Sequence, residues 1–312
     1  MSVTNDLPDK ATFELLSNQL GIGAAFVEKD WHVTRVIGVI AELHYRNFEI
    51  IFTGGTALSK AHNLLYRFSE DVDFRALPSL EVSQNRKSLS RFKNAIIEEL
   101  RCNNFVINAN QIKARDENRF FSIELDYESY FSRADALRPH IQIEVKVIGL
   151  QRAPIYLPVS SFLRTAKKNP PEVERIACID PVESAADKLS ALAWRIPDRV
   201  RGGEQDDPSI VRHIHDLALL KDMALAAKDF PRMVASSMQE DNDRAKNDPS
   251  FSGMAISKKF QNMLQVLDTD QEYGFEYARF VQAMSYAAEG EIPDFQTALQ
   301  ALRILIDFVI SP

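Results

Sequence analysis

The chain has 312 residues, of which 45% are hydrophobic and 26% are charged, and its formal net charge is −7. This composition is typical of a folded globular protein and excludes a largely disordered or collagen-like chain. No apolar run reaches the roughly 18 residues that a membrane-spanning helix needs, so we expect no membrane partner.

The first ten residues lack the basic and apolar regions of a secretory signal, and Cys102 and Cys178 are the two cysteines of the sequence. Two cysteines exclude a metal cluster built on cysteine and are typical of a reducing compartment. We therefore expect a cytoplasmic protein.

Predicted elements alternate between helix and strand in the first half of the chain. Helical spacing of apolar residues predicts helices over residues 9–46, and residues 48–52 form a β-prone run that ends in Gly54-Gly55. A short helix is expected over residues 56–61, directly after that turn. The further elements expected in this half are strands over residues 71–74, 120–127 and 141–147 and a helix over residues 84–101.

From Gly149 onward we expect only helices, after a stretch that several prolines interrupt. Asp180 is suited to cap a helix that begins at Pro181 and ends near residue 195. Later helices are expected up to residue 228 and in the last sixty residues. The layout predicts an α+β protein, with a lobe built on a small mixed sheet over residues 1–158 and an α-helical lobe over residues 159–312.

Charge is unevenly distributed along the chain. Residues 229–312 carry 13 acidic and 7 basic side chains, whereas residues 152–201 carry 9 basic and 6 acidic ones. The acidic total argues against nonspecific nucleic-acid binding by the whole protein, but the second segment can form a local basic surface. The alternative interpretation of that segment is an ordinary solvated surface.

The strongest chemical motif is Gly54-Gly55-Thr56, followed by Asp71-Val72-Asp73. A glycine turn after a strand lets a polyphosphate approach the backbone, and the helix that follows offers free N–H groups. Two aspartates two positions apart on a strand point to the same face, where their oxygens suit Mg²⁺. A site for two ions needs a third carboxylate from a neighbouring strand.

The third carboxylate has three candidates. Glu144 lies in the middle of the polar face of the strand over residues 141–147, and Glu124 and Asp126 lie on the preceding strand. Taken alone, Gly-Gly-Thr is most often a turn and Asp-x-Asp an exposed strand face. The ordered combination of turn, aspartate pair and acidic strand is much more specific than either part.

These motifs resemble the signature of the AbiEii-type nucleotidyltransferase toxins of type IV toxin–antitoxin systems, which belong to the DNA polymerase β-like superfamily. The pattern GGT-x-L-x-K and then R-x-S-x-D-x-D matches Gly54, Gly55, Thr56, Leu58, Lys60, Arg67, Ser69, Asp71 and Asp73. The resemblance continues with Glu144, with Lys188 at the position of an essential lysine, and with Asp216 on the next helix. It covers about residues 48–220, and the long spacing before Asp71 favours this subfamily over antibiotic-modifying enzymes.

The resemblance implies a polymerase β-like nucleotidyltransferase lobe and a Mg²⁺-dependent enzyme that uses an NTP. Its reaction would transfer NMP to an RNA acceptor such as the tRNA 3′ end, release pyrophosphate and block translation and growth. The implied partners are the RNA and a cognate antitoxin, the implied setting is phage defence, and we expect a monomer. Transfer to a protein or small-molecule hydroxyl and a non-catalytic nucleotide-binding protein remain as alternatives, and the identity of the NTP is open.

The resemblance also implies residue roles. The catalytic set is Ser69, Asp71, Asp73, Glu144, Lys188 and Asp216, in which Asp71, Asp73 and Glu144 hold the metal. The nucleotide-binding set is Gly54, Gly55, Thr56, Lys60 and Arg67. The helical lobe would contribute Lys188 and Asp216 to the nucleotide cleft. For the RNA backbone we expect contacts from the basic segment, namely Arg164, Lys167, Lys168, Arg195, Arg199 and Arg201.

Overall fold

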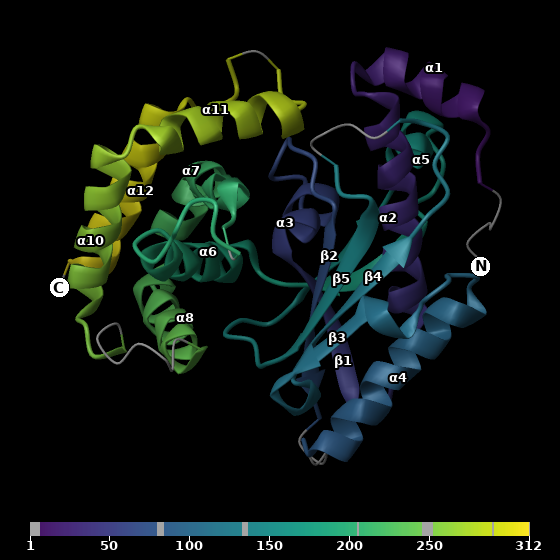
Figure 1. The fold of residues 1–312 in the computed structure, drawn as a ribbon, viewed down its shortest axis with the longest axis horizontal. Coiled ribbons are helices and arrows are strands. Elements are labelled where there is room, and N and C mark those ends of the chain that lie inside the picture. Colours follow the sequence, from purple (N-terminus) through teal and green to yellow (C-terminus); the bar gives the residue numbers. More distant parts are fainter. Residues whose placement is uncertain are drawn as a thin grey trace. The chain divides into compact units, whose positions relative to one another are not determined.

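The computed structural model describes residues 7–79, 84–132, 137–204, 206–244, 252–288 and 290–311 (Figure 1). The chain divides into two compact units. The first comprises Met1–Asn63 and Phe68–Ile179, and the second comprises Leu64–Arg67 and Asp180–Pro312. Within the described ranges, no helix combines the length and the apolar character needed to cross a membrane.

A mixed sheet forms the centre of the first unit, with its seven strands in the order β3-β4-β5-β2-β1-β7-β6. β1 and β2 are antiparallel, whereas β2 and β5 are parallel. The strands are β1 Phe48–Thr53, β2 Asp71–Pro78, β3 Ile112–Arg115, β4 Phe120–Asp126, β5 His140–Val147, β6 Ile155–Val159 and β7 Val173–Cys178.

The helices of the first unit are α1 Lys10–Leu20, α2 Ala24–Glu42, α3 Gly54–Thr56, α4 Arg86–Cys102 and α5 Phe162–Ala166, and α3 continues into the π-helical turn η1 Ala57–Ala61. Two of them, α2 and α4, pack against the apolar face of the sheet. Apolar side chains of α2 and α4 share one core cluster with those of β2, β4 and β5. Because side chains alternate along a strand, the intervening polar residues of β2 and β5 lie on the opposite face.

The second unit is helical. It contains α6 Pro181–Arg195, η4 Pro208–Val211, α7 Arg212–Ala226, α8 Phe230–Arg244, α10 Ile256–Thr269, α11 Glu272–Met284 and α12 Phe295–Ile310. The expected start of α6 is confirmed, because the Asp180 side chain accepts a hydrogen bond of 2.8 Å from the N–H of Val182 and Pro181 occupies the first turn. Leucines such as Leu189, Leu217 and Leu302 are fully buried in this unit.

The α+β class is confirmed, but the expectation of helices alone after Gly149 is wrong. β6 and β7 lie in that stretch, and the two units separate between Ile179 and Asp180, beyond the boundary expected after residue 158. β6 is an edge strand and contains Pro158, which a sheet edge tolerates because one side of the strand needs no hydrogen bonds. The short edge strand β3 was not expected either.

Candidate active site

The turn between β1 and α3 lies directly against an aspartate of β2. Gly54 has a φ of 76°, in the left-handed region that favours glycine. A Cβ atom placed on Gly54 would fall on the Asp73 carboxylate, with Asp73 Cγ only 2.9 Å away. Glycine therefore allows the turn and this carboxylate to occupy adjacent space.

Gly54→Ala should damage the first unit more than a small side chain ordinarily would. The left-handed backbone alone costs about 1–2 kcal/mol for alanine, and the contact with Asp73 adds to that cost. Gly21→Ala is the matched control, because Gly21 has a φ of 67° and open space where a Cβ would lie. We expect Gly54→Ala to lower the melting temperature at least twice as far as Gly21→Ala. Equal decreases in melting temperature would show that the contact with Asp73 does not affect the stability of the first unit.

Three carboxylates lie on the polar face of the sheet. In the register of the strands, Asp73 of β2 is paired with Glu144 of the parallel strand β5 and with Thr53 of β1, and Asp71 is paired with Gln142. Burial alternates along the whole of β5 and over residues 71–74 of β2. The side chains of Asp71, Asp73 and Glu144 therefore share one face.

The two rival carboxylates lie one strand further away, on β4. Glu124 is opposite Gln142, and its carboxylate accepts a hydrogen bond of 2.8 Å from Lys113, which lowers the pKa of Glu124. Asp126 accepts a hydrogen bond of 2.7 Å from the Gln111 side chain. Of the three candidates for the third carboxylate, Glu144 is the one in register with Asp73.

Neighbouring side chains donate hydrogen bonds to Asp71 and Glu144. Arg138 Nη1 donates to Asp71 Oδ1 at 2.5 Å and to Gln142 Oε1 at 2.9 Å, and Gln142 Nε2 donates to Glu144 Oε1 at 2.8 Å. Among the residues that the structure describes, no three acidic, His or Cys side chains are already gathered around one metal position. The donor set nevertheless fits a hard divalent cation, because it offers carboxylate oxygens and already holds a cationic guanidinium on Asp71.

Thr56 ties α3 to the start of β2. Its Oγ1 lies 2.9 Å from Ser69 Oγ and donates a hydrogen bond to the main-chain carbonyl of Asp71. Thr56 is fully buried, whereas Ser69 is half-buried. The contacts of the Thr56 hydroxyl are thus those of a positioning residue for Ser69 and Asp71.

Lys60 is paired with a carboxylate of α2. Its ammonium forms a buried ion pair with Asp30 of α2, and Asp30 also accepts a hydrogen bond of 2.7 Å from the N–H of Phe162. Burial raises the pKa of Asp30 above 3.8, and the ammonium of Lys60 opposes that shift. The pair joins η1, α2 and α5, so the contacts of Lys60 are architectural in this structure.

The other expected site residues gather within the second unit. Arg67 donates to both oxygens of Asp216, at 2.7 Å each, and Lys188 Nζ lies 3.0 Å from Asp216 Oδ2. All three side chains are buried. Burial alone would raise the pKa of Asp216, but Arg67 and Lys188 outweigh it and hold that pKa well below 3.8. Burial lowers the pKa of Lys188, against the effect of Asp216.

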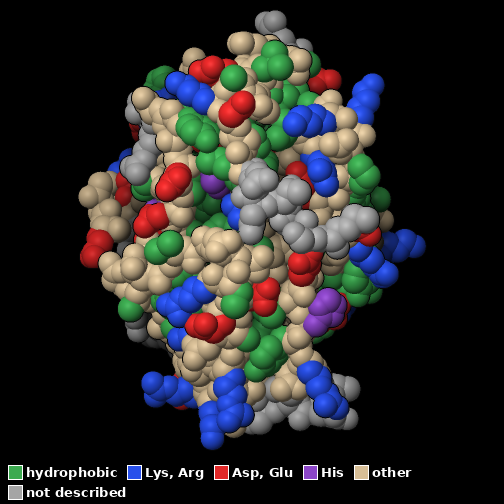
Figure 2. Space-filling view, turned by 90° about the vertical axis from the view of Figure 1, so that its right-hand side faces the viewer, with side chains coloured by type: hydrophobic (Ala, Val, Ile, Leu, Met, Phe, Trp, Pro, Cys, Tyr) green, Lys and Arg blue, Asp and Glu red, His purple; other side chains and the backbone are tan. Residues whose placement is uncertain are grey.

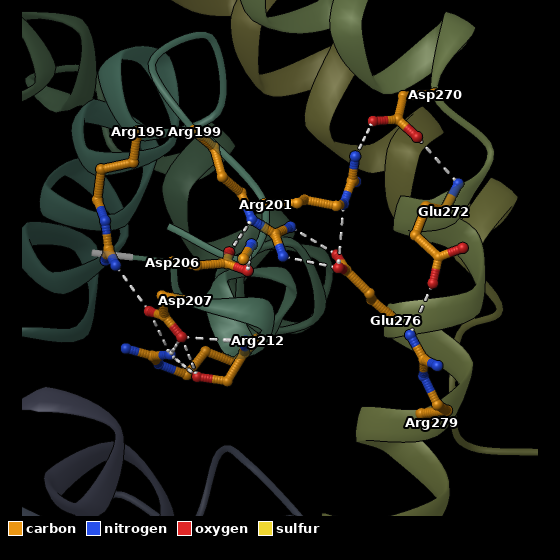
Figure 3. A network of polar contacts seen from close by, with 12 residues as sticks. Arg195, Arg199, Arg201, Asp206, Asp207, Arg212, Asp270, Glu272, Glu276 and Arg279 are labelled. Atoms are coloured by element: carbon orange, nitrogen blue, oxygen red, sulfur yellow. Dashed lines mark hydrogen bonds and ion pairs between the residues drawn. The ribbon is translucent and has the colours of Figure 1, made fainter. Parts of the chain in front are cut away.

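Three of the six basic residues expected on RNA are engaged in ion pairs of the second unit (Figure 3). Arg199 donates to both oxygens of Glu276, at 2.6 Å each, and its side chain is only 5% exposed. Arg201 also contacts Glu276, and Arg195 lies 2.6 Å from Asp207. The interpretation of Arg199 as a surface contact is therefore wrong: it joins the loop before η4 to α11.

The other three basic residues belong to the first unit. Lys167 and Lys168 are exposed at the turn that follows α5. Arg164 is half-buried and donates a hydrogen bond of 2.7 Å to the main-chain carbonyl of Pro170. The six basic residues are thus divided between the two units, and four of them, Arg164, Arg195, Arg199 and Arg201, have hydrogen-bond or ion-pair partners within their own unit.

The family of the chain follows from a comparison with protein-family models. The family model of the nucleotidyl transferase AbiEii toxins of type IV toxin–antitoxin systems matches residues 46–301, which is most of the chain. Among solved structures, the chain is similar to MenT4, a nucleotidyltransferase toxin from Mycobacterium tuberculosis H37Rv, with 14% identity, a TM-score of 0.49 and coverage of 94% of this chain and 98% of that chain. A comparison with curated protein sequences finds no match. The chain belongs to the AbiEii family of nucleotidyltransferase toxins of type IV toxin–antitoxin systems.

Proposed function

We propose that this toxin transfers NMP from an NTP to a hydroxyl of RNA, with the tRNA 3′ end as the expected acceptor. Pyrophosphate leaves, and the modified RNA can no longer serve in translation, which stops growth. The observation that carries the proposal is the register that sets Asp73 beside Glu144 and against the Gly54 turn. We further propose that the chain acts as a cytoplasmic monomer, and its family implies a cognate antitoxin as partner.

We assign the metal to the shared face of β2 and β5. Asp71 and Asp73 would hold Mg²⁺, and Glu144 would complete the site and take the proton of the acceptor hydroxyl. A bound Mg²⁺ supplies neutralisation of phosphate charge. The fixed strands keep the three carboxylates in place before substrate arrives, which is how positioning and preorganised charge lower a barrier.

We assign phosphate contacts of the NTP to the glycine turn of the first unit. Main-chain N–H groups at Gly54 and Gly55 begin the continuous helical run of α3 and η1, and such groups bind phosphate oxygens. In the second unit, Arg67 and Lys188 both contact the carboxylate of Asp216. We propose that Lys188 supplies a phosphate contact there, because its ammonium is a compact point charge that can donate to a phosphate oxygen.

The acceptor is tested by incubating the full chain with Mg²⁺, total RNA and each α-labelled NTP in turn. We expect label in an RNA band of tRNA size with at least one NTP. Label in the protein itself would favour the alternative acceptor, a protein hydroxyl. No label in any fraction would favour a non-catalytic nucleotide-binding protein.

RNA affinity should depend on Lys167 and Lys168, which remain exposed. Each phosphate contact releases counterions, so Lys167→Glu with Lys168→Glu should weaken binding of a tRNA mixture and reduce the slope of log Kd against log salt by about 1.5 to 2. NTP affinity should be unchanged, since neither lysine belongs to the assigned phosphate site.

The matched control lies on α4. Its first half carries exposed Arg86, Lys87 and Arg91, and Figure 2 shows Lys and Arg side chains gathered at the lower end of the view, where α4 begins. Lys87→Glu with Arg91→Glu changes the net charge by the same amount and should leave the slope near that of the wild type. A slope changed by the α4 pair and unchanged by the other pair would place the RNA on α4.

A further inference from the structure

Arg138 lies two residues before β5 and places its guanidinium on the carboxylate of Asp71. Its Nη1 lies 2.5 Å from Asp71 Oδ1 and 2.9 Å from Gln142 Oε1. Gln142 in turn donates to Glu144 at 2.8 Å. Donors of the protein itself therefore occupy Asp71 and Glu144, two of the carboxylates that we assign to the metal.

The main chain of Arg138 is fixed, whereas its side chain is exposed. The N–H of Arg138 donates to Glu70 Oε2 at 2.9 Å, and its carbonyl accepts a hydrogen bond of 2.7 Å from Lys29. Lys29 and Glu70 are buried and form an ion pair with each other. The Arg138 side chain is 41% exposed and that of Asp71 is 29% exposed. The guanidinium can therefore leave Asp71 by rotation of the side chain while the main chain stays in place.

We propose that Arg138 is a built-in counter-ion that competes with the divalent cation for Asp71. Without metal it neutralises and positions the carboxylate, and binding of the cation displaces it. This inference rests on the proposed function, because it assumes that Asp71 holds the metal. A guanidinium and a divalent cation a few ångströms apart repel each other, so both do not remain on one carboxylate.

The competition should lower cation affinity without abolishing it. A half-exposed ion pair contributes little stability, so displacing Arg138 costs little. The same pair weakens the binding of a free cation until a nucleotide adds its own negative charge to the site. Arg138 would thus couple occupation of the metal site to the arrival of the NTP.

The test is a calorimetric titration of the full chain with Mn²⁺ in the absence of nucleotide. We expect Arg138→Gln to bind Mn²⁺ about two- to fivefold more tightly than the wild type. Arg138→Lys should fall between the two, because a flexible ammonium replaces the planar fork. Arg115→Gln is the matched control: Arg115 lies over the Phe120 ring at the β3 edge, and its loss should leave the affinity unchanged.

Affinity of Arg138→Gln and Arg138→Lys equal to or below that of the wild type, with unchanged melting curves, would overturn the inference. Asp71→Asn separates this failure from that of the proposed function. If Asp71→Asn binds Mn²⁺ as the wild type does, Asp71 is no metal ligand and both proposals fail. If Asp71→Asn loses binding while Arg138→Gln equals the wild type, only the role of Arg138 is lost.

Discussion

Asp73→Asn should reduce nucleotidyl transfer by about 1,000-fold or more while the first unit stays folded. The amide keeps the shape that fits beside the Gly54 turn, but it lacks the charge that holds a divalent cation. Initial rates of NMP incorporation, measured together with thermal melting, separate a loss of chemistry from a loss of fold.

Glu124→Gln is the matched control for this prediction. Glu124 lies on the same face of the sheet but one strand further away, and its carboxylate is held by Lys113. We expect its rate to stay within about threefold of the wild type, whereas Glu144→Gln should resemble Asp73→Asn. A near-normal rate for Asp73→Asn would show that the metal site is wrongly assigned. A large loss of rate for Glu124→Gln, without one for Glu144→Gln, would show that the third metal ligand is Glu124 of β4.

Asp216→Asn should destabilise the second unit by about 3–5 kcal/mol, because it leaves Arg67 and Lys188 buried without their shared carboxylate. The sequence has two tryptophans, Trp31 in the first unit and Trp194 in the second. In a Trp31→Phe background, Trp194 fluorescence during urea unfolding reports the second unit.

Its control is Asp268→Asn, which removes a surface pair with Arg303 and should cost less than about 1 kcal/mol. The pKa of Asp216 is held well below 3.8 in the folded unit, so its stabilising effect is complete above the unfolded value of about 4. As pH falls toward the folded pKa, that stabilisation is lost. The difference in the free energy of unfolding between wild type and Asp216→Asn should therefore be constant from pH 7 to 5 and shrink below pH 4. Equal losses of stability for Asp216→Asn and Asp268→Asn would contradict the stabilising role of the buried cluster.

Local periodicity explains why much of the site could be predicted from the sequence. Alternation with a period of two places Asp71 and Asp73 on one face, and glycine is required where the turn adopts a positive φ. The register between strands is a tertiary property, so the sequence left Glu124 and Asp126 open as rivals of Glu144. The pairing of β2 with β5 distinguishes them spatially.

Ion pairs between residues far apart in the sequence are what the motif could not reveal. Lys60 follows the glycine turn at the family spacing, yet its ammonium lies on Asp30, thirty residues earlier in the chain. Arg138 precedes a strand with no spacing that marks it, and yet it contacts Asp71. Arg199 stands in a basic segment and is neutralised by Glu276 from a distant helix. The partner of a charged residue depends on how the chain packs, and a count of charges along the sequence gives no information on packing.

The central claim is that this chain joins NMP to RNA and releases pyrophosphate. The most direct measurement follows both products in one reaction, with Mg²⁺, RNA and the NTP that gives the strongest labelling, for the wild type and for Asp73→Asn. We expect one pyrophosphate released per NMP incorporated by the wild type, and neither product from Asp73→Asn. Consumption of NTP by the wild type without label in RNA, or equal incorporation by the two proteins, would contradict the claim.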